Sequence, residues 1–125
     1  MAILSMISRV LDDLKEVISY KIFNDVTTDE TTSDEIEVLD AEAVTLVVET
    51  SASVSAGSII LEGSMTSGYA GTWLALATIT TSAATKAYEV SISVANGDPI
   101  VRYVRVRVDT AVANGTVDAY INVRR

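Results

Sequence analysis

The clearest pattern in this sequence is an alternation of apolar and polar residues over residues 99–108. A period of two predicts a β-strand with one solvated face, because successive side chains of a strand point to opposite sides of a sheet. Arg105 and Arg107 then point outward, since a register shift of one residue would bury both of these cations. The positions predicted to face a core are Val104, Val106 and Val108.

Similar short apolar segments, separated by turn-forming residues, continue through most of the chain, as is typical of an all-β sandwich. The segments between them are too short for crossover helices, so the strands are expected to be antiparallel. The sequence predicts a mainly β fold, an antiparallel β-sandwich of about seven to eight strands over residues 35–125. The expected strands lie near Glu35–Leu39, Ala43–Glu49, Ser58–Gly63, Trp73–Thr80, Ala87–Val94, Ile100–Val108 and Thr116–Val123.

The alternation also predicts which side chains of the other strands face the core. The Asn114-Gly115 dipeptide is a strong signal for a two-residue hairpin, so the last two strands are expected to pair directly. The predicted inward positions are Val44, Leu46, Val48, Ile59, Leu61, Tyr88, Val90, Ile92, Val94, Val117, Ala119, Ile121 and Val123.

Residues 1–23 show a different period and predict an N-terminal α-helix. Their apolar residues recur at alternating spacings of three and four, which is the seam of a heptad pattern. The stripe either packs on the chain's own sandwich or contacts another subunit or a larger assembly. In the second case its residues are the candidate assembly contacts, namely Leu4, Ile7, Leu11, Leu14 and Ile18.

Residues 24–34 contain one large apolar residue and four acids, which predicts a solvated acidic linker between the helix and the sandwich. Clustered carboxylates raise the possibility of a Ca²⁺ site. The ligand spacing of an EF-hand loop is absent, however, and so is its glycine, so we expect no metal.

Composition narrows the function classes. The chain has no cysteine and no histidine, which excludes thiolate chemistry and a Ser-His-Asp hydrolase, and no catalytic or cofactor-binding group stands out. The net charge is −8, which argues against nucleic acid as a partner. The chain has no apolar run of ~20 residues and no signal-peptide pattern, so we expect no membrane partner and folding in a cytoplasm.

One constellation has the residue types of a ligand site. Tyr69 and Trp73 flank a glycine-rich loop, and an exposed aromatic pair of this kind can stack on a sugar ring. Together with Arg105 they form the candidate ligand patch of a carbohydrate-binding alternative. Trp73 also begins an apolar strand, which favours core or rim packing. For Arg105, an ordinary cross-strand pair with Asp118 is the simpler role.

Four segments carry a resemblance to a known class of proteins: Gly57–Ser64, Gly71–Ile79, Arg102–Val106 and Gly115–Ile121. Their pattern resembles the small jelly-roll or discoidin-like sandwiches of tailed-bacteriophage virion proteins, which occur in head decoration (cement) proteins and tail-fibre modules. The resemblance spans about residues 43–124. The same pattern is also similar to carbohydrate-binding sandwiches.

The resemblance implies a non-enzymatic capsid decoration protein that binds the major capsid protein, stabilises the phage head and lies on the capsid surface after synthesis in the host cytoplasm. The alternatives are a carbohydrate-binding or adhesin module of a tail fibre or baseplate, and a tail or baseplate subunit. Decoration proteins of this kind are often trimers. The apolar stripe and the weakly charged strand Ala43–Val48 also favour a homo-oligomer, so we expect a homotrimer.

Overall fold

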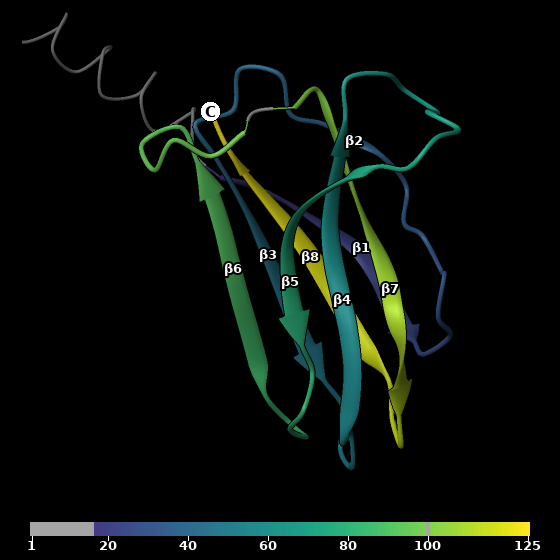
Figure 1. Ribbon diagram of the computed structural model, residues 1–125. Helices are drawn as coiled ribbons and strands as arrows, with labels where there is room; N and C mark the ends of the chain where they lie inside the picture. The colour runs from purple at the N-terminus through teal and green to yellow at the C-terminus, as the bar shows by residue number, and fades with distance from the viewer. Residues whose placement is uncertain (1–16, 100) are drawn as a thin grey trace, which may run out of the picture.

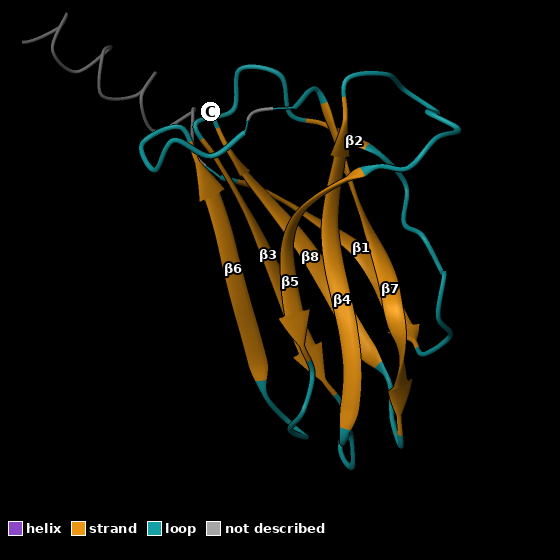
Figure 2. Ribbon diagram, viewed as in Figure 1, coloured by secondary structure: helices purple, strands orange, loops and turns teal. Residues whose placement is uncertain are grey.

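The computed structural model describes residues 17–99 and 101–125, and these residues form eight β-strands and no helix. The strands follow one another along the chain with only turns and loops between them (Figures 1 and 2). Their bounds are β1 Ile18–Val26, β2 Ile36–Glu37, β3 Ala43–Thr50, β4 Ala56–Ser64, β5 Leu74–Thr80, β6 Ala87–Ser93, β7 Tyr103–Ala113 and β8 Val117–Arg124.

The strands form two four-stranded antiparallel sheets. One sheet has the order β1-β8-β3-β6 and the other the order β2-β7-β4-β5. Figure 1 shows the two sheets lying over each other as the layers of a sandwich. Every strand contributes to the interior, the short β2 through the partly buried Ile36, and each sheet leaves its other face toward solvent.

The predicted fold class, a sandwich with an N-terminal α-helix, is wrong in its helical part. Residues 18–23 belong to β1, which pairs with β8 and buries Phe23. Ile18 therefore lies in a strand, whereas Leu4, Ile7, Leu11 and Leu14 lie outside the described residues. A heptad spacing reports only local preference. Here the free edge of β8 offers a ladder of hydrogen bonds, and β-branched residues such as Ile18 and Ile22 suit a strand.

The segment predicted to be a solvated linker runs along the outer edge of β7. The amide of Glu30 donates a hydrogen bond to the carbonyl of Val108 (2.7 Å), and the amide of Ser33 donates to the carbonyl of Val106 (2.8 Å). In return, the amide of Val108 donates to the carbonyl of Thr31 (2.9 Å). Most of the segment's side chains remain solvated, but its backbone occupies the strand edge. We call β1, residues 27–34 and β7 the closed side of the sandwich.

The core lies between the sheets, where the strand alternation places it. Val104, Val106 and Val108 of β7 are fully buried, and Arg105 and Arg107 point to the opposite face, so the predicted register of this strand is confirmed. The other predicted inward positions are buried or partly buried, apart from Val94. That residue follows the end of β6 and its side chain is 57% exposed.

The turn at Asn114-Gly115 reverses the chain, but the predicted pairing of the last two strands is wrong, because β7 and β8 belong to different sheets. Asn114 has a φ of 66°, the left-handed conformation that such turns require. A Cβ on Gly115 would lie 2.6 Å from a methyl group of Val54. The turn is therefore packed against the neighbouring loop and directs β8 to the other sheet.

Candidate functional site

The outer face of the β2-β7-β4-β5 sheet carries a buried ion-pair cluster centred on Glu62 of β4. Arg105 lies opposite Glu62 in the β4–β7 register, and its Nε donates to Glu62 Oε1 at 2.7 Å. The Nε of Arg107 donates to the other oxygen, Oε2, at 3.2 Å. The Glu62 side chain is 3% exposed, so its charge is desolvated and compensated by two guanidinium groups.

Arg107 extends the cluster toward the closed side. Its Nη1 donates to Glu30 at 3.2 Å and to Asp109 at 3.1 Å. Burial of the Arg107 guanidinium opposes its charge, but the hydrogen bonds to Glu62 and Asp109 and the charges of Glu62 and Glu30 outweigh this, so the pKa of Arg107 is raised. The cluster thus ties β4 and β7 to the segment that covers the β7 edge.

Asp118, the predicted partner of the Arg-bearing strand, lies on the other sheet. There it pairs with Lys21 at 3.6 Å and accepts a hydrogen bond from the amide of Asp25 at 2.8 Å. The prediction failed because it assumed that β7 and β8 are neighbours. The actual partner, Glu62, could have been found from the sequence as the lone acid at an outward position of the apolar segment Ile59–Gly63.

The candidate ligand patch of Tyr69, Trp73 and Arg105 is brought together, but not as an open aromatic platform. The guanidinium carbon of Arg105 lies 4.1 Å from the centroid of the Trp73 ring, a cation–π contact. The indole Nε1 of Trp73 donates to the carbonyl of Tyr69 at 2.8 Å, and Trp73 is 5% exposed. Tyr69 is about half exposed. Trp73 therefore packs at the rim of the sheet and closes over the ion-pair cluster.

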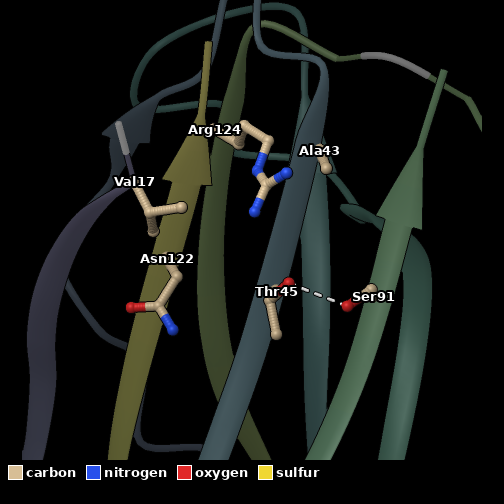
Figure 3. A pocket seen from close by; sticks show the side chains of 6 residues that line it. All are labelled: Val17, Ala43, Thr45, Ser91, Asn122 and Arg124. Carbon is tan, nitrogen blue, oxygen red and sulfur yellow. Dashed lines mark hydrogen bonds between the residues drawn. The ribbon is translucent and has the colours of Figure 1, made fainter. Parts of the chain in front are cut away.

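The opposite face, formed by β8, β3 and β6, has a shallow depression of about 380 Å³ near the start of β1. Figure 3 shows Asn122 and Arg124 on β8, Thr45 on β3 and Ser91 on β6, all on this face. The hydroxyl groups of Thr45 and Ser91 hydrogen-bond to each other at 2.7 Å. Amide, hydroxyl and guanidinium groups over small side chains can bind a polar ligand, but the depression contains no acid–base pair.

In the part of the chain that the structure describes, there is neither a cluster of metal-binding residues nor a helix that could span a membrane. Over residues 17–99 and 101–125, no three carboxylates, histidines or cysteines are arranged to hold a metal ion. Glu30 of the acidic segment is instead within ion-pair distance of Arg107. Within the same residues, no helix has the length and apolar character to cross a membrane.

The fold recurs in solved structures of three kinds. The SPBc2 prophage-derived protein YomS aligns with a TM-score of 0.58 at 15% identity, covering 88% of this chain and 94% of YomS. The K3 cleaved adhesin domain of Lys-gingipain from Porphyromonas gingivalis W83 aligns with a TM-score of 0.59 at 13% identity, covering 87% of this chain and 74% of that domain.

The third kind is a carbohydrate-binding module. Chitosan-binding module 2 of a chitosanase/glucanase from Paenibacillus sp. IK-5, solved in complex with chitotriose, aligns with a TM-score of 0.50 at 12% identity, covering 87% of this chain and 95% of the module. No protein-family model matches the sequence, and a search of curated proteins finds no significant match. At these identities the similarity concerns the fold, a β-sandwich used by prophage, adhesin and binding-module proteins.

Proposed function

We propose that this chain is a non-enzymatic structural protein of a tailed-phage virion, a capsid decoration protein that binds the major capsid protein and stabilises the phage head. The observation that carries the proposal is the shared fold with the prophage-derived YomS, which extends over nearly the whole of both chains. On this proposal the protein lies on the capsid surface.

The architecture of the outer faces supports a structural role. The most buried charge, Glu62, is held by Arg105 and Arg107, and Arg105 is covered on one side by Trp73. Ion pairs that are closed in this way stiffen a sheet, and none of these three charged groups is then free for proton transfer. The sandwich is then a rigid body whose partners bind at its surfaces and ends.

The proposed contact to the capsid is the apolar stripe of the N-terminal segment, residues Leu4, Ile7, Leu11 and Leu14, with the exposed Ile18 at the start of β1. An apolar stripe flanked by charges suits a groove on a protein partner. The acids of residues 1–50 add electrostatic attraction to basic patches, so attachment should weaken as salt increases.

Sedimentation with DNA-free heads of the phage that encodes the chain tests this proposal. The full chain should co-sediment with the heads, and the Ile7→Asp/Leu11→Asp variant should not, because both changes place charge in the stripe. A matched control is Asp12→Glu/Asp13→Glu, which changes two acids of the same segment without changing its charge. Equal binding of the first variant and the wild type would rule out the stripe, and no binding by the wild type would rule out the decoration role.

A carbohydrate-binding or adhesin role is the second candidate, and the depression in Figure 3 favours it. The side chains of Asn122 and Arg124 lie beside a pair of hydroxyl groups in a depression otherwise lined by Val17 and Ala43. Such groups suit the hydroxyls of a saccharide. The patch at Trp73 is less suitable, because Arg105 already occupies a face of the indole.

A glycan array distinguishes the two candidates. If the chain is a sugar-binding module, the purified protein should bind a restricted set of glycans, and Asn122→Ala/Arg124→Ala should abolish that binding. Arg102→Ala, which removes an exposed arginine at the other sheet, is the control. Absence of binding to every glycan, together with binding to phage heads, would leave the decoration role alone.

A further inference from the structure

The four strands at the sheet edges differ in how they are protected against pairing with another chain. An exposed edge presents unpaired N–H and C=O groups, and proteins protect it with charges, irregularities or short length. β1 carries Lys21 and two register shifts, β2 has two residues, and β6 carries Glu89 at its centre. β5 has one register shift against β4, but of the three longer edge strands it is the one without a charge, since Leu74–Thr80 contains no charged residue and no proline.

The lack of charge extends well beyond β5. From Gly63 to Thr85 the sequence contains no aspartate, glutamate, lysine or arginine, although the chain as a whole is strongly charged. Leu74 at the start of β5 is 53% exposed, and Leu76 and Val90 nearby are only partly buried. We call β5 and β6 the open side of the sandwich, because β5 and β6 lie near each other but belong to different sheets.

The outer edge of β5 has no hydrogen-bond partner among residues 17–99 and 101–125. β5 pairs with β4 along one edge, from Ser58↔Thr80 to Gly63↔Leu74, and ends its sheet on the other. The equivalent edge of the same sheet, next to β7, is covered by residues 27–34 and by β2. One edge of this sheet is thus covered by the chain itself, and the other has no such cover among the residues that the structure describes.

We propose that a second copy of this chain covers the open side, with the two β5 strands pairing antiparallel about a two-fold axis. Two identical uncharged strands are self-complementary in this arrangement, and the two sheets join into one eight-stranded sheet. No like charges meet at the axis, which could not be said of β1 or β6. The exposed Leu74 and the partly buried Leu76 and Val90 supply apolar contact beside the strand pair.

The pairing predicts a dimer of moderate affinity rather than the trimer that the phage resemblance implies. A stable interface buries about 1,200–2,000 Å² in total, and a single pair of seven-residue edge strands is a small contact by comparison. We therefore expect association at micromolar concentrations. The inference does not depend on the virion assignment, because it rests on the strand edges alone.

Sedimentation equilibrium of the full chain tests the interface over about 1–100 µM, a range centred on the micromolar dissociation constant that we expect. Wild-type protein should change from monomer to dimer in this range. Thr78→Lys should raise the dissociation constant at least ~10-fold, because it would place one lysine from each copy close to the two-fold axis, where the like charges repel. Thr78 is exposed, so the fold should survive. Thr28→Lys, an exposed threonine on the closed side, is the matched control and should leave the dissociation constant unchanged.

Amide hydrogen exchange at low and high concentration gives a second, independent readout. On dimer formation the amides of Leu74–Thr80 that do not bond to β4 should become protected. A monomer at all concentrations, a trimer, or a dimer that Thr78→Lys does not weaken would overturn the proposal. Protection of the β5 amides in a monomer would also overturn it, because another segment of the same chain would then be the occupant.

Discussion

The closed side and the open side of the sandwich differ in what happens to the hydrogen-bonding edge of a strand. On the closed side, the edge of β7 is paired by the backbone of residues 27–34, a segment rich in Asp, Glu and Thr. On the open side, the edge of β5 is left unpaired among the described residues, and the surrounding sequence carries no charge from Gly63 to Thr85.

This difference teaches that a polar segment is not necessarily a solvated linker, and that an apolar strand edge is not necessarily covered by the rest of the chain. Residues 27–34 bury few side chains, yet their amides and carbonyls complete a strand ladder. Backbone hydrogen bonds are independent of side-chain type, so a hydrophilic segment can close an edge at little cost in buried polar groups. The side with fewer charges is the one whose strand edge lacks a partner among the described residues.

The largest expected effect comes from a substitution that unfolds the whole sandwich, and with it both the closed side and the open side. Val106 is fully buried at the centre of β7, so Val106→Asp would bury a carboxylate without a partner and should abolish cooperative folding. Circular dichroism during a thermal melt measures this. Thr110→Asp, at an exposed position of the same strand, should melt close to wild type. A Val106→Asp variant with the wild-type Tm would contradict the described core.

The next effect concerns the ion-pair cluster that connects β4 to β7 and to residues 27–34 on the closed side. Glu62→Gln should lower the free energy of unfolding by about 2 kcal/mol, because two guanidinium groups lose their shared carboxylate. Breaking a fully buried ion pair costs ~3–5 kcal/mol. The expected loss is smaller here because the two arginines are partly exposed. Urea unfolding measures the change.

Glu37→Gln is the matched control for Glu62→Gln. Glu37 pairs with Arg102 at 3.8 Å in a half-exposed setting, so its removal should change the unfolding free energy by less than ~0.5 kcal/mol. Equal effects of the two substitutions would show that the Glu62 cluster contributes no more than a surface ion pair.

A smaller effect should follow from loosening the segment that covers β7. The Oγ of Ser33 accepts a hydrogen bond from the amide of Val106 at 2.9 Å. Ser33→Ala removes this bond and should cost about 1 kcal/mol. Amide exchange of Glu30 and Ser33 should accelerate, while exchange in β5 stays as in wild type. Thr32→Ala, with an exposed side chain beside Ser33, is the control.

The smallest effect is a pH dependence on the open side. Burial opposes ionisation of the Tyr88 phenol, but hydrogen bonding from Ser82 and the Ala83 amide, with the nearby Lys86 charge, lowers the pKa of Tyr88 below its usual 10.0. A lowered acid pKa in the folded state adds stability as pH rises through the folded value toward the unfolded one, and adds none at neutral pH. Ultraviolet titration should therefore detect one tyrosine that ionises at a lower pH than usual. Tyr88→Phe should remove this signal, whereas Tyr69→Phe should leave the signal unchanged.

Within single strands, much of the structure could be predicted from the sequence. The alternation around Val104, Val106 and Val108 gave the correct register, because burying two arginines is costly enough to exclude the alternative. The residue types of Tyr69, Trp73 and Arg105 also indicated residues that lie close together, although the Trp73 indole is buried and the Arg105 guanidinium covers one of its faces. The assembly contacts proposed in the N-terminal segment remain a prediction.

Relations between strands could not be predicted in the same way. The turn at Asn114-Gly115 was identified, but a reversal does not specify which sheet the next strand joins, and the partner of Arg105 was therefore taken to be Asp118 instead of Glu62. The helix predicted over residues 1–23 failed at Ile18–Phe23 for a similar reason. A spacing of three and four records local preference, whereas the available edge of β8 is a long-range property.

The sequence by itself determined the short antiparallel strands, their inward faces and the uncharged region around β5, because side-chain alternation and charge are local properties of the chain. Only the tertiary structure decided that residues 27–34 cover β7, that Glu62 holds both arginines, and that β5 ends its sheet without a partner among the described residues. Backbone amides and carbonyls are the same in nearly every residue. Which strand edges become paired therefore depends on the order of strands in space, which no local pattern encodes.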